Sequence, residues 1–179
     1  MALPINVSDL INRRVVESAR IEYKGNWNPA PILHSICAFA NDIDNWGGGY
    51  IIIGIDKMDG IPQFPVRGLE KSSIDRINKE LLQKCNLIEP RYIPVVEQTT
   101  IDGKEIIVLW IPGGDARPYK CPVSFPTEKA TAKGEKACYI RKMSNSIRAN
   151  QLEEKELFML ANNVPYDDRI NLHANIADM

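Results

Sequence analysis

Residues 17–24 read E-S-A-R-I-E-Y-K, and residues 47–56 read G-G-G-Y-I-I-I-G-I-D. In the first segment apolar and polar side chains alternate from Ala19 to Tyr23, which predicts a half-buried β-strand with its charged residues on one face. In the second segment the run from Tyr50 to Ile55 is apolar on both faces, which predicts a central strand. The chain between the two segments must therefore connect two strands.

A helix is expected in that connection. Asn28 is a suitable N-cap, Pro29 occupies the favoured first position, and apolar residues recur at helical spacing as far as Ile43. Gly47 to Gly49 then require a loop. These glycines lack the lysine and the serine or threonine of a phosphate-binding loop, and they precede a strand instead of following one. We therefore do not expect this domain alone to bind or hydrolyse ATP.

The rest of the chain adds further strands and helices. Ser72 and Asp75 predict the capping box of a helix that buries apolar residues, Leu82 among them. The dipeptide Asp102-Gly103 predicts a hairpin between two strands. The remaining expected elements are a loop at 112–136, a short strand at 139–142 and a helix that opens at Asn150 with Glu153 completing its cap. The predicted fold class is α/β (α+β), a mixed β-sheet packed with about three helices.

Length and composition indicate one globular domain. A chain of 179 residues can bury a single core, and its 44% hydrophobic and 25% charged residues are typical of a folded protein in water. The longest apolar runs are strand-sized, so no membrane span is expected, and the N-terminus lacks the pattern of a signal peptide. The cysteines are widely spaced, which indicates reduced thiols in a cytoplasmic protein. They are Cys37, Cys85, Cys121 and Cys138.

Three carboxylates, Glu17, Glu22 and Asp56, lie at strand ends near glycines. Hard cations such as Mg²⁺ prefer carboxylate oxygens, and such an ion can activate water or stabilise the charge of a reacting phosphodiester. Glu17 and Glu22 are five residues apart, so on one regular strand they would point to opposite faces. Glu17 must then lie on a turn before the strand if the two share an ion. The alternative pairs Glu22 with Arg20 or Lys24 and leaves Glu17 solvated.

Positive charge is concentrated late in the chain. The net charge is −1, but residues 115–148 hold eight basic residues against three acidic ones. Such a region can face phosphates, or it can be a solvated lysine-rich loop. Trp27 and Trp46 lie in predicted loops and are candidates for base stacking, although a tryptophan can equally cover a helix end. Arg141 can pair with an acid or reach a phosphate. The basic candidates for contact with nucleic acid are Lys24, Arg117, Lys120, Arg141, Lys142 and Arg148.

The segments at 17–24, 38–41 (A-F-A-N), 47–56 and 139–141 (Y-I-R) together resemble the Schlafen-type AlbA-like domain in their order and spacing. The resemblance extends from Val15 to about Ala161, and we assign residues 1–163 to this domain. Residues 164–179 are similar to the linker that follows the domain in bacterial members, or to the start of a following domain. The resemblance thus implies the N-terminal part of a longer bacterial protein with a C-terminal domain.

The resemblance also implies an association with nucleic acid. In animal Schlafens the domain forms a metal-dependent endoribonuclease that acts on structured RNA, and its site uses two glutamates five residues apart and an aspartate at the end of a later strand. Glu17, Glu22 and Asp56 match these positions and are the candidate catalytic residues and ligands of an Mg or Mn ion. Two lobes of the animal proteins form one groove, which implies that a single-lobe protein can form a homodimer.

Three functions are consistent with these observations. The first is a nucleic-acid-binding domain, for RNA or DNA, in a larger protein such as a transcriptional regulator. The second is a metal-dependent endoribonuclease. The third is a regulatory or interaction domain of the kind of bacterial member that is described as ATP-binding. The residues alone leave open whether the chain is an enzyme.

Overall fold

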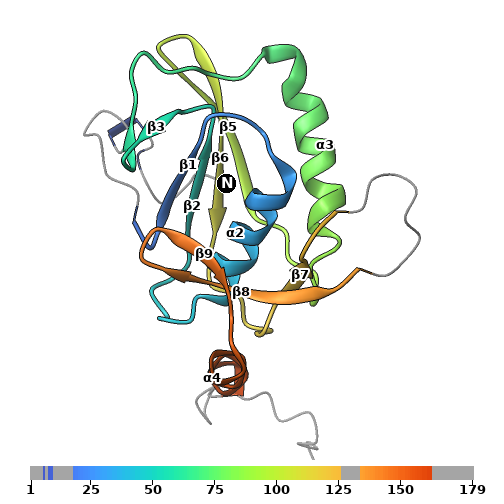
Figure 1. The fold of residues 1–179 in the computed structure, drawn as a ribbon. Coiled ribbons are helices and arrows are strands. Elements are labelled where there is room, and N and C mark those ends of the chain that lie inside the picture. The colour runs from blue at the N-terminus through green and yellow to red at the C-terminus, as the bar shows by residue number, and fades with distance from the viewer. Residues whose placement is uncertain (1–5, 7, 10–17, 126–133, 163–179) are drawn as a thin grey trace, which may run out of the picture.

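The structure is a computed structural model that describes residues 6, 8–9, 18–125 and 134–162 (Figure 1). Within these ranges, no helix combines the length and the apolar character needed to cross a bilayer. The main sheet has four strands in the order β1-β2-β6-β5. Its strands are β1 (Ile21–Lys24), β2 (Gly49–Ile53), β5 (Val95–Ile101) and β6 (Lys104–Ile111).

The pairing in this sheet is mixed, because β1 runs parallel to β2 whereas β2, β6 and β5 are antiparallel neighbours. The hairpin of β5 and β6 turns at Asp102-Gly103, where both residues have positive φ, as the sequence predicts. The mixed sheet and the three helices of the described residues confirm the α+β fold class.

The helix α2 (Pro29–Asn41) makes the crossover that parallel strands require. It follows Asn28, starts with Pro29 and ends at Asp42, whose backbone is left-handed with φ 40°. From Ile32 to Asn41 nearly every side chain is buried. The reason is that α2 lies between the main sheet and a second sheet, so it has two faces to cover and not one (Figure 1).

The second sheet has the antiparallel order β7-β8-β9 and covers α2 on the side away from the main sheet. Its strands are β7 (Lys120–Pro122), β8 (Lys136–Lys142) and β9 (Asn145–Arg148). The sequence prediction of an uninterrupted loop at 112–136 is wrong, since β7 lies within it, and β9 was missed. Strands of three and four residues, one of them ending in proline, are too short to show a period of two. A further small hairpin joins β3 (Lys57–Met58) to β4 (Ile61–Pro62).

The main sheet separates two apolar cores. Tyr23 and Ile52 point to one core, whereas Ile51 and Ile53 point to the other and pack against Ile36 of α2. β2 is buried on both faces, as its continuous apolar run predicts. All four cysteines are buried and free of disulfides, in agreement with the prediction of reduced thiols.

The helix α3 (Ile74–Cys85) starts differently from the prediction. A 3₁₀ turn, Lys71–Ser73, precedes it. The capping box at Ser72 and Asp75 is therefore wrong, because the helix begins two residues later, and the described residues show no side-chain capping bond at Ser73. Leu82 is 50% exposed and does not join the core.

The helix α4 (Gln151–Asn162) begins with the predicted capping box. Asn150 Oδ1 accepts hydrogen bonds from the backbone N–H groups of Leu152 (2.9 Å) and Glu153 (3.0 Å). Glu153 Oε2 in turn accepts from the backbone N–H of Asn150 (2.9 Å). Leu157 is the buried side chain of this helix, which lies at one end of the molecule, away from the main sheet (Figure 1).

Asn41 ties α2 to the second sheet. Its Nδ2 donates to the carbonyl oxygens of Tyr119 (3.0 Å) and Tyr139 (2.8 Å), and its Oδ1 accepts from the backbone N–H of Tyr119 (2.7 Å). The side chain is fully buried. One amide thus satisfies backbone groups in two chain segments that lie about 80 and 100 residues further along the sequence.

We predict that Asn41→Ala lowers the free energy of unfolding by about 3 kcal/mol, because it leaves buried backbone groups of Tyr119 and Tyr139 without partners. Urea denaturation followed by circular dichroism measures the change. Asn86→Ala, at an exposed helix end, is the matched control and should change stability by less than about 0.5 kcal/mol. Equal effects of the two substitutions would contradict this role of Asn41.

Candidate functional site

Glu22 lies in the middle of the edge strand β1, on the face that packs toward α2. Its side chain is only 6% exposed. Oε1 lies 2.6 Å from Nζ of Lys24, and Oε2 lies 2.8 Å from Nη1 of Arg141. The sequence left open a pairing of Glu22 with Arg20 or Lys24, and the structure shows the pairing with Lys24. The contact with Arg141 was not predicted, because Arg141 lies 119 positions further along the sequence.

Arg141, on β8, is the centre of this cluster. Its Nη1 also donates to Ser146 Oγ (3.0 Å), and its Nη2 donates to the carbonyl oxygen of Ser18 (2.9 Å). Its guanidinium lies over the ring of Phe39, 4.7 Å from the centroid. These contacts join β1, α2, β8 and β9. Of the two roles that the sequence allowed for Arg141, pairing with an acid is the one observed.

The cluster of Glu22, Lys24 and Arg141, called here the β1 charge cluster, holds two cations and one carboxylate. A buried carboxylate needs compensation by opposite charge, and Arg141 alone supplies one positive charge. Lys24 adds a second, and its side chain is 23% exposed. The cluster therefore carries a net positive charge at β1, the outer strand of the main sheet.

Asp56 follows β2 and lies beside the end of β1. A Cβ built on Gly25, the residue after β1, would lie 2.0 Å from Asp56 Oδ1. The carboxylate pairs with Arg67, with 3.1 Å between Oδ1 and Nη1, and is 49% exposed. The parallel pairing of β1 and β2 thus brings Asp56 near the strand that carries Glu22, as the sequence suggests.

The two described residues of the predicted metal site, Glu22 and Asp56, are both paired with cations of the protein. The described part of the chain contains no group of three or more histidine, cysteine or acidic side chains that could hold a metal ion. Both oxygens of Glu22 contact cations, and Asp56 contacts Arg67. Glu17 lies outside the described residues, so the site of three carboxylates stays a prediction.

Three of the basic candidates are held by acceptors of the protein itself. Arg117 donates to the carbonyl oxygens of Gly114 (2.7 Å) and Asp42 (3.2 Å). Lys120 pairs with Glu154 of α4 at 3.0 Å, and this hydrogen bond raises the pKa of Lys120. Arg148 pairs with Glu135. Lys142, in contrast, is exposed at the turn between β8 and β9.

The two candidate tryptophans differ in their surroundings. Trp27 packs partly buried against the core and donates from Nε1 to Glu80 Oε2 (2.9 Å), which is the structural role that the sequence left open. Trp46 lies in the loop between α2 and β2 and is 56% exposed. The structure brings Trp46 next to the β1 charge cluster, because Trp46 and Arg141 line one small cavity of about 10 Å³.

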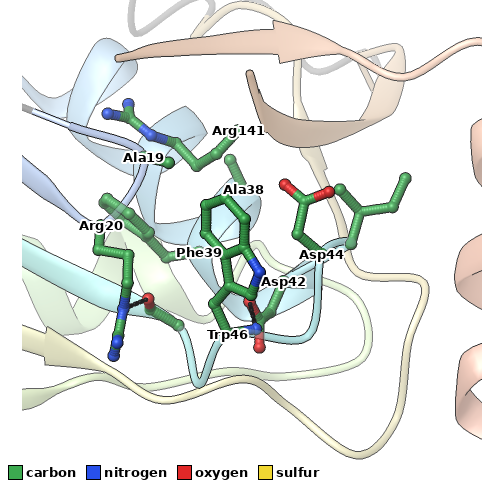
Figure 2. A pocket seen from close by; sticks show the side chains of 10 residues that line it. Ala19, Arg20, Ala38, Phe39, Asp42, Asp44, Trp46 and Arg141 are labelled. Carbon is green, nitrogen blue, oxygen red and sulfur yellow. Dashed lines mark hydrogen bonds between the residues drawn. The ribbon is translucent and has the colours of Figure 1, made fainter. Parts of the chain in front are cut away.

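Sequence reasoning missed Arg20 as a site residue. Figure 2 shows it on one side of the Trp46 ring, in the same cavity lining. Arg20 precedes β1 and donates from Nε to the carbonyl oxygen of Gly48 (3.1 Å). The sequence could have indicated Arg20, because residues 20, 22 and 24 recur at every second position and so share the charged face of the predicted strand.

We predict that Glu22→Gln lowers the free energy of unfolding by about 3–5 kcal/mol, since it leaves two close cations without their carboxylate. Replacing both Glu22 and Arg141 by methionine should recover a large part of this loss, because apolar side chains of similar volume can replace a buried ion pair. Chemical denaturation of the single and double variants measures both changes. A double variant less stable than Glu22→Gln would contradict the pairing.

Comparisons with known proteins agree with the resemblance seen in the sequence. Among solved structures, the fold is similar to that of the DIP2311 protein from Corynebacterium diphtheriae, with 16% identity and a TM-score of 0.51. The similarity covers 78% of this chain and 27% of that chain, so the present chain spans about a quarter of the other protein. It is also similar to the N-terminal domain of a RecG-related protein from Nitrosomonas europaea. In that case the identity is 20%, the TM-score 0.49, and the coverage 79% of this chain and 89% of that chain.

Comparison with the curated proteins gives no match. The family model described as "Schlafen, AlbA_2" matches residues 17–150. The matched range contains every element from β1 to β9 and ends before α4. It therefore includes the β1 charge cluster, the Trp46 loop and the main sheet. The chain belongs to the Schlafen AlbA_2 family.

Proposed function

We propose that this domain binds nucleic acid at the surface formed by β1, the turn between β8 and β9, and the loop that carries Trp46. The observation that carries the proposal is the β1 charge cluster, in which Lys24 and Arg141 share the single carboxylate of Glu22. An excess of positive charge with one partly exposed cation, Lys24, attracts phosphate. The association with nucleic acid that the family resemblance implies supports the same conclusion.

Lys24 is suited to such a contact. An ammonium group has three donors, and Glu22 accepts from Lys24 at 2.6 Å on one side. Since the side chain is 23% exposed, a phosphate oxygen can accept from the ammonium group while the ion pair stays intact. Glu22 then holds Lys24 in place, so that little side-chain entropy is lost when the phosphate binds.

Lys142 extends the same surface. Successive residues of a strand point to opposite faces, so Arg141 points inward to Glu22 whereas Lys142 is exposed. The buried arginine fixes the position of the strand that presents the exposed lysine. Arg117, Lys120 and Arg148 have protein acceptors, and we expect them to contribute less to phosphate contact than Lys24 and Lys142 do.

We predict that Lys24→Gln and Lys142→Gln each weaken the binding of a labelled RNA or DNA oligonucleotide by about 3- to 10-fold at low salt, and that each lowers the slope of log K against log salt by about one. Fluorescence anisotropy at several salt concentrations measures both quantities. Lys79→Gln on α3, where Lys79 pairs with Asp75, is the matched control and should leave affinity unchanged. Wild-type protein that binds no nucleic acid at low salt would disprove the proposal.

The metal-dependent endoribonuclease is the second candidate. The observation that favours it is the position of Asp56 beside Gly25, at the end of the strand that carries Glu22. An ion bound by these carboxylates would have to compete with Lys24, Arg141 and Arg67 for their oxygens. The assignment of Glu17, Glu22 and Asp56 to such a site, with Mg²⁺ or Mn²⁺ as its metal, stays a prediction.

Incubation of a structured RNA with Mg²⁺ or Mn²⁺ separates the two candidates. Asp56→Asn is the suitable variant, because the side chain of Asp56 is half exposed and its loss should leave the fold intact, unlike that of Glu22. For the binding domain we expect salt-sensitive binding without cleavage. Metal-dependent cleavage that Asp56→Asn abolishes would instead support the nuclease.

A further inference from the structure

The loop that carries Trp46 is fixed at its start by Asp42. The Asp42 carboxylate accepts from the backbone N–H groups of Trp46 (Oδ1, 3.0 Å) and Gly47 (Oδ2, 2.9 Å). Its carbonyl oxygen accepts from the backbone N–H of Asn45 (2.8 Å) and from Nη1 of Arg117 (3.2 Å). Asp42 therefore fixes the start of the loop, with two backbone N–H groups bound to its carboxylate and two further donors bound to its carbonyl oxygen.

The end of the loop is fixed by packing. Gly48 has φ 76°, and a Cβ at this position would lie 1.9 Å from the carbonyl oxygen of Ile111. A Cβ at Gly49 would lie 2.2 Å from the ring of Phe39. The backbone is therefore closely packed at Gly48 and Gly49, directly after the tryptophan. The indole itself is 56% exposed, although burial would stabilise so large an apolar ring.

Arg20 adds a cation to the lining of the cavity that Trp46 also lines. Its side chain is exposed, and Nε donates to Gly48 O, which orients the guanidinium along the loop. A Cβ on Gly47 would lie 3.7 Å from Arg20 Nη2, so the outer part of the guanidinium lies next to the residue that follows Trp46. A guanidinium has five N–H donors, and the hydrogen bond to Gly48 O uses the one on Nε, so the Nη groups can donate to a ligand.

The charged residues on the two sides of the Trp46 ring have opposite sign. Figure 2 shows Arg20 on one side of the Trp46 ring and Asp44 on the other. Asp44 is exposed and repels a phosphate, whereas Arg20 attracts one. A nucleotide whose base stacks on Trp46 therefore has its phosphate on the Arg20 side. The bases of a duplex are already stacked on each other, so the exposed indole can accept only an unpaired base.

We infer that Trp46 and Arg20 form a subsite for one unpaired nucleotide, which gives the domain a preference for single-stranded nucleic acid over duplex. The inference rests on the proposed function, because it names the kind of nucleic acid that the same surface takes. Trp46 supplies the stacking face, and Arg20 supplies the phosphate contact. Asp44 disfavours a nucleotide bound with its phosphate on the other side of the ring.

The test compares a labelled single-stranded oligonucleotide with the duplex of the same sequence by fluorescence anisotropy. Loss of one base–aromatic stack corresponds to about 5- to 150-fold in affinity. We expect Trp46→Ala to weaken single-strand binding by about tenfold and duplex binding by less than about twofold, and Trp46→Phe to restore most of the loss. Arg20→Gln should lower the salt slope for single strands by about one. Asp44→Asn should strengthen single-strand binding, because it removes a repulsive charge.

Met58→Ala is the control for loss of an exposed apolar side chain, since Met58 is 63% exposed on β3. Thermal unfolding verifies that each variant is folded. If the wild type binds single strands and Trp46→Ala binds them equally well, or loses the same factor for duplex, the subsite is disproved while the proposed function stands. If the wild type binds neither form, both fail.

Discussion

The buried contact between Glu22 and Arg141 holds the two sheets of this domain in one arrangement. The two residues are separated by 119 positions in sequence, and both side chains are 6% exposed. Desolvating both charges costs free energy that an apolar pair would not cost, so such a pair adds little net stability. The ion pair instead fixes the position of β8 on α2, because a shift of β8 along the helix would leave a charge buried without its partner. Asn41 acts in the same way on the same strand and on the segment before β7, by hydrogen bonds to Tyr139 and Tyr119.

The function of the surface follows from what this fixed arrangement leaves exposed. The cations that sequence analysis grouped together separate into those that hold the fold, such as Arg141 and Arg117, and those that face solvent, such as Lys142. Lys24 belongs to both groups. A charged residue therefore cannot be assigned to ligand binding by its position in a basic region alone. Its acceptors within the protein decide how much of its charge is available to a phosphate.

The sequence predicted the fold well where the signal is local. The alternation around Glu22, the crossover helix after Asn28, the Asp102-Gly103 hairpin and the cap at Asn150 all depend on residues within a few positions of each other, and the structure contains each of these elements. The prediction failed at Ser72, where a 3₁₀ turn takes the place of the expected first helical turn.

The site was less predictable because its contacts are long-range. Nothing near Glu22 in the sequence indicates that a strand more than a hundred residues later covers it. The loop of Trp46 packs at Gly48 against Ile111, a contact that a local pattern does not contain. Arg20 could have been found, since it shares the face of Glu22 and Lys24, but only the folded loop brings it to the tryptophan. Position on a strand face is readable from sequence, whereas the partner across the fold is not.

The burial of all four cysteines has a chemical consequence for the domain. The thiolate is the form that reacts with oxidants and alkylating reagents. Burial raises the pKa of Cys85 and of Cys138 to about 12, and it also raises the pKa of Cys37. At neutral pH these three thiols are protonated and enclosed by the core. The folded domain should therefore keep the same surface charge and the same fold when the redox state of its surroundings changes.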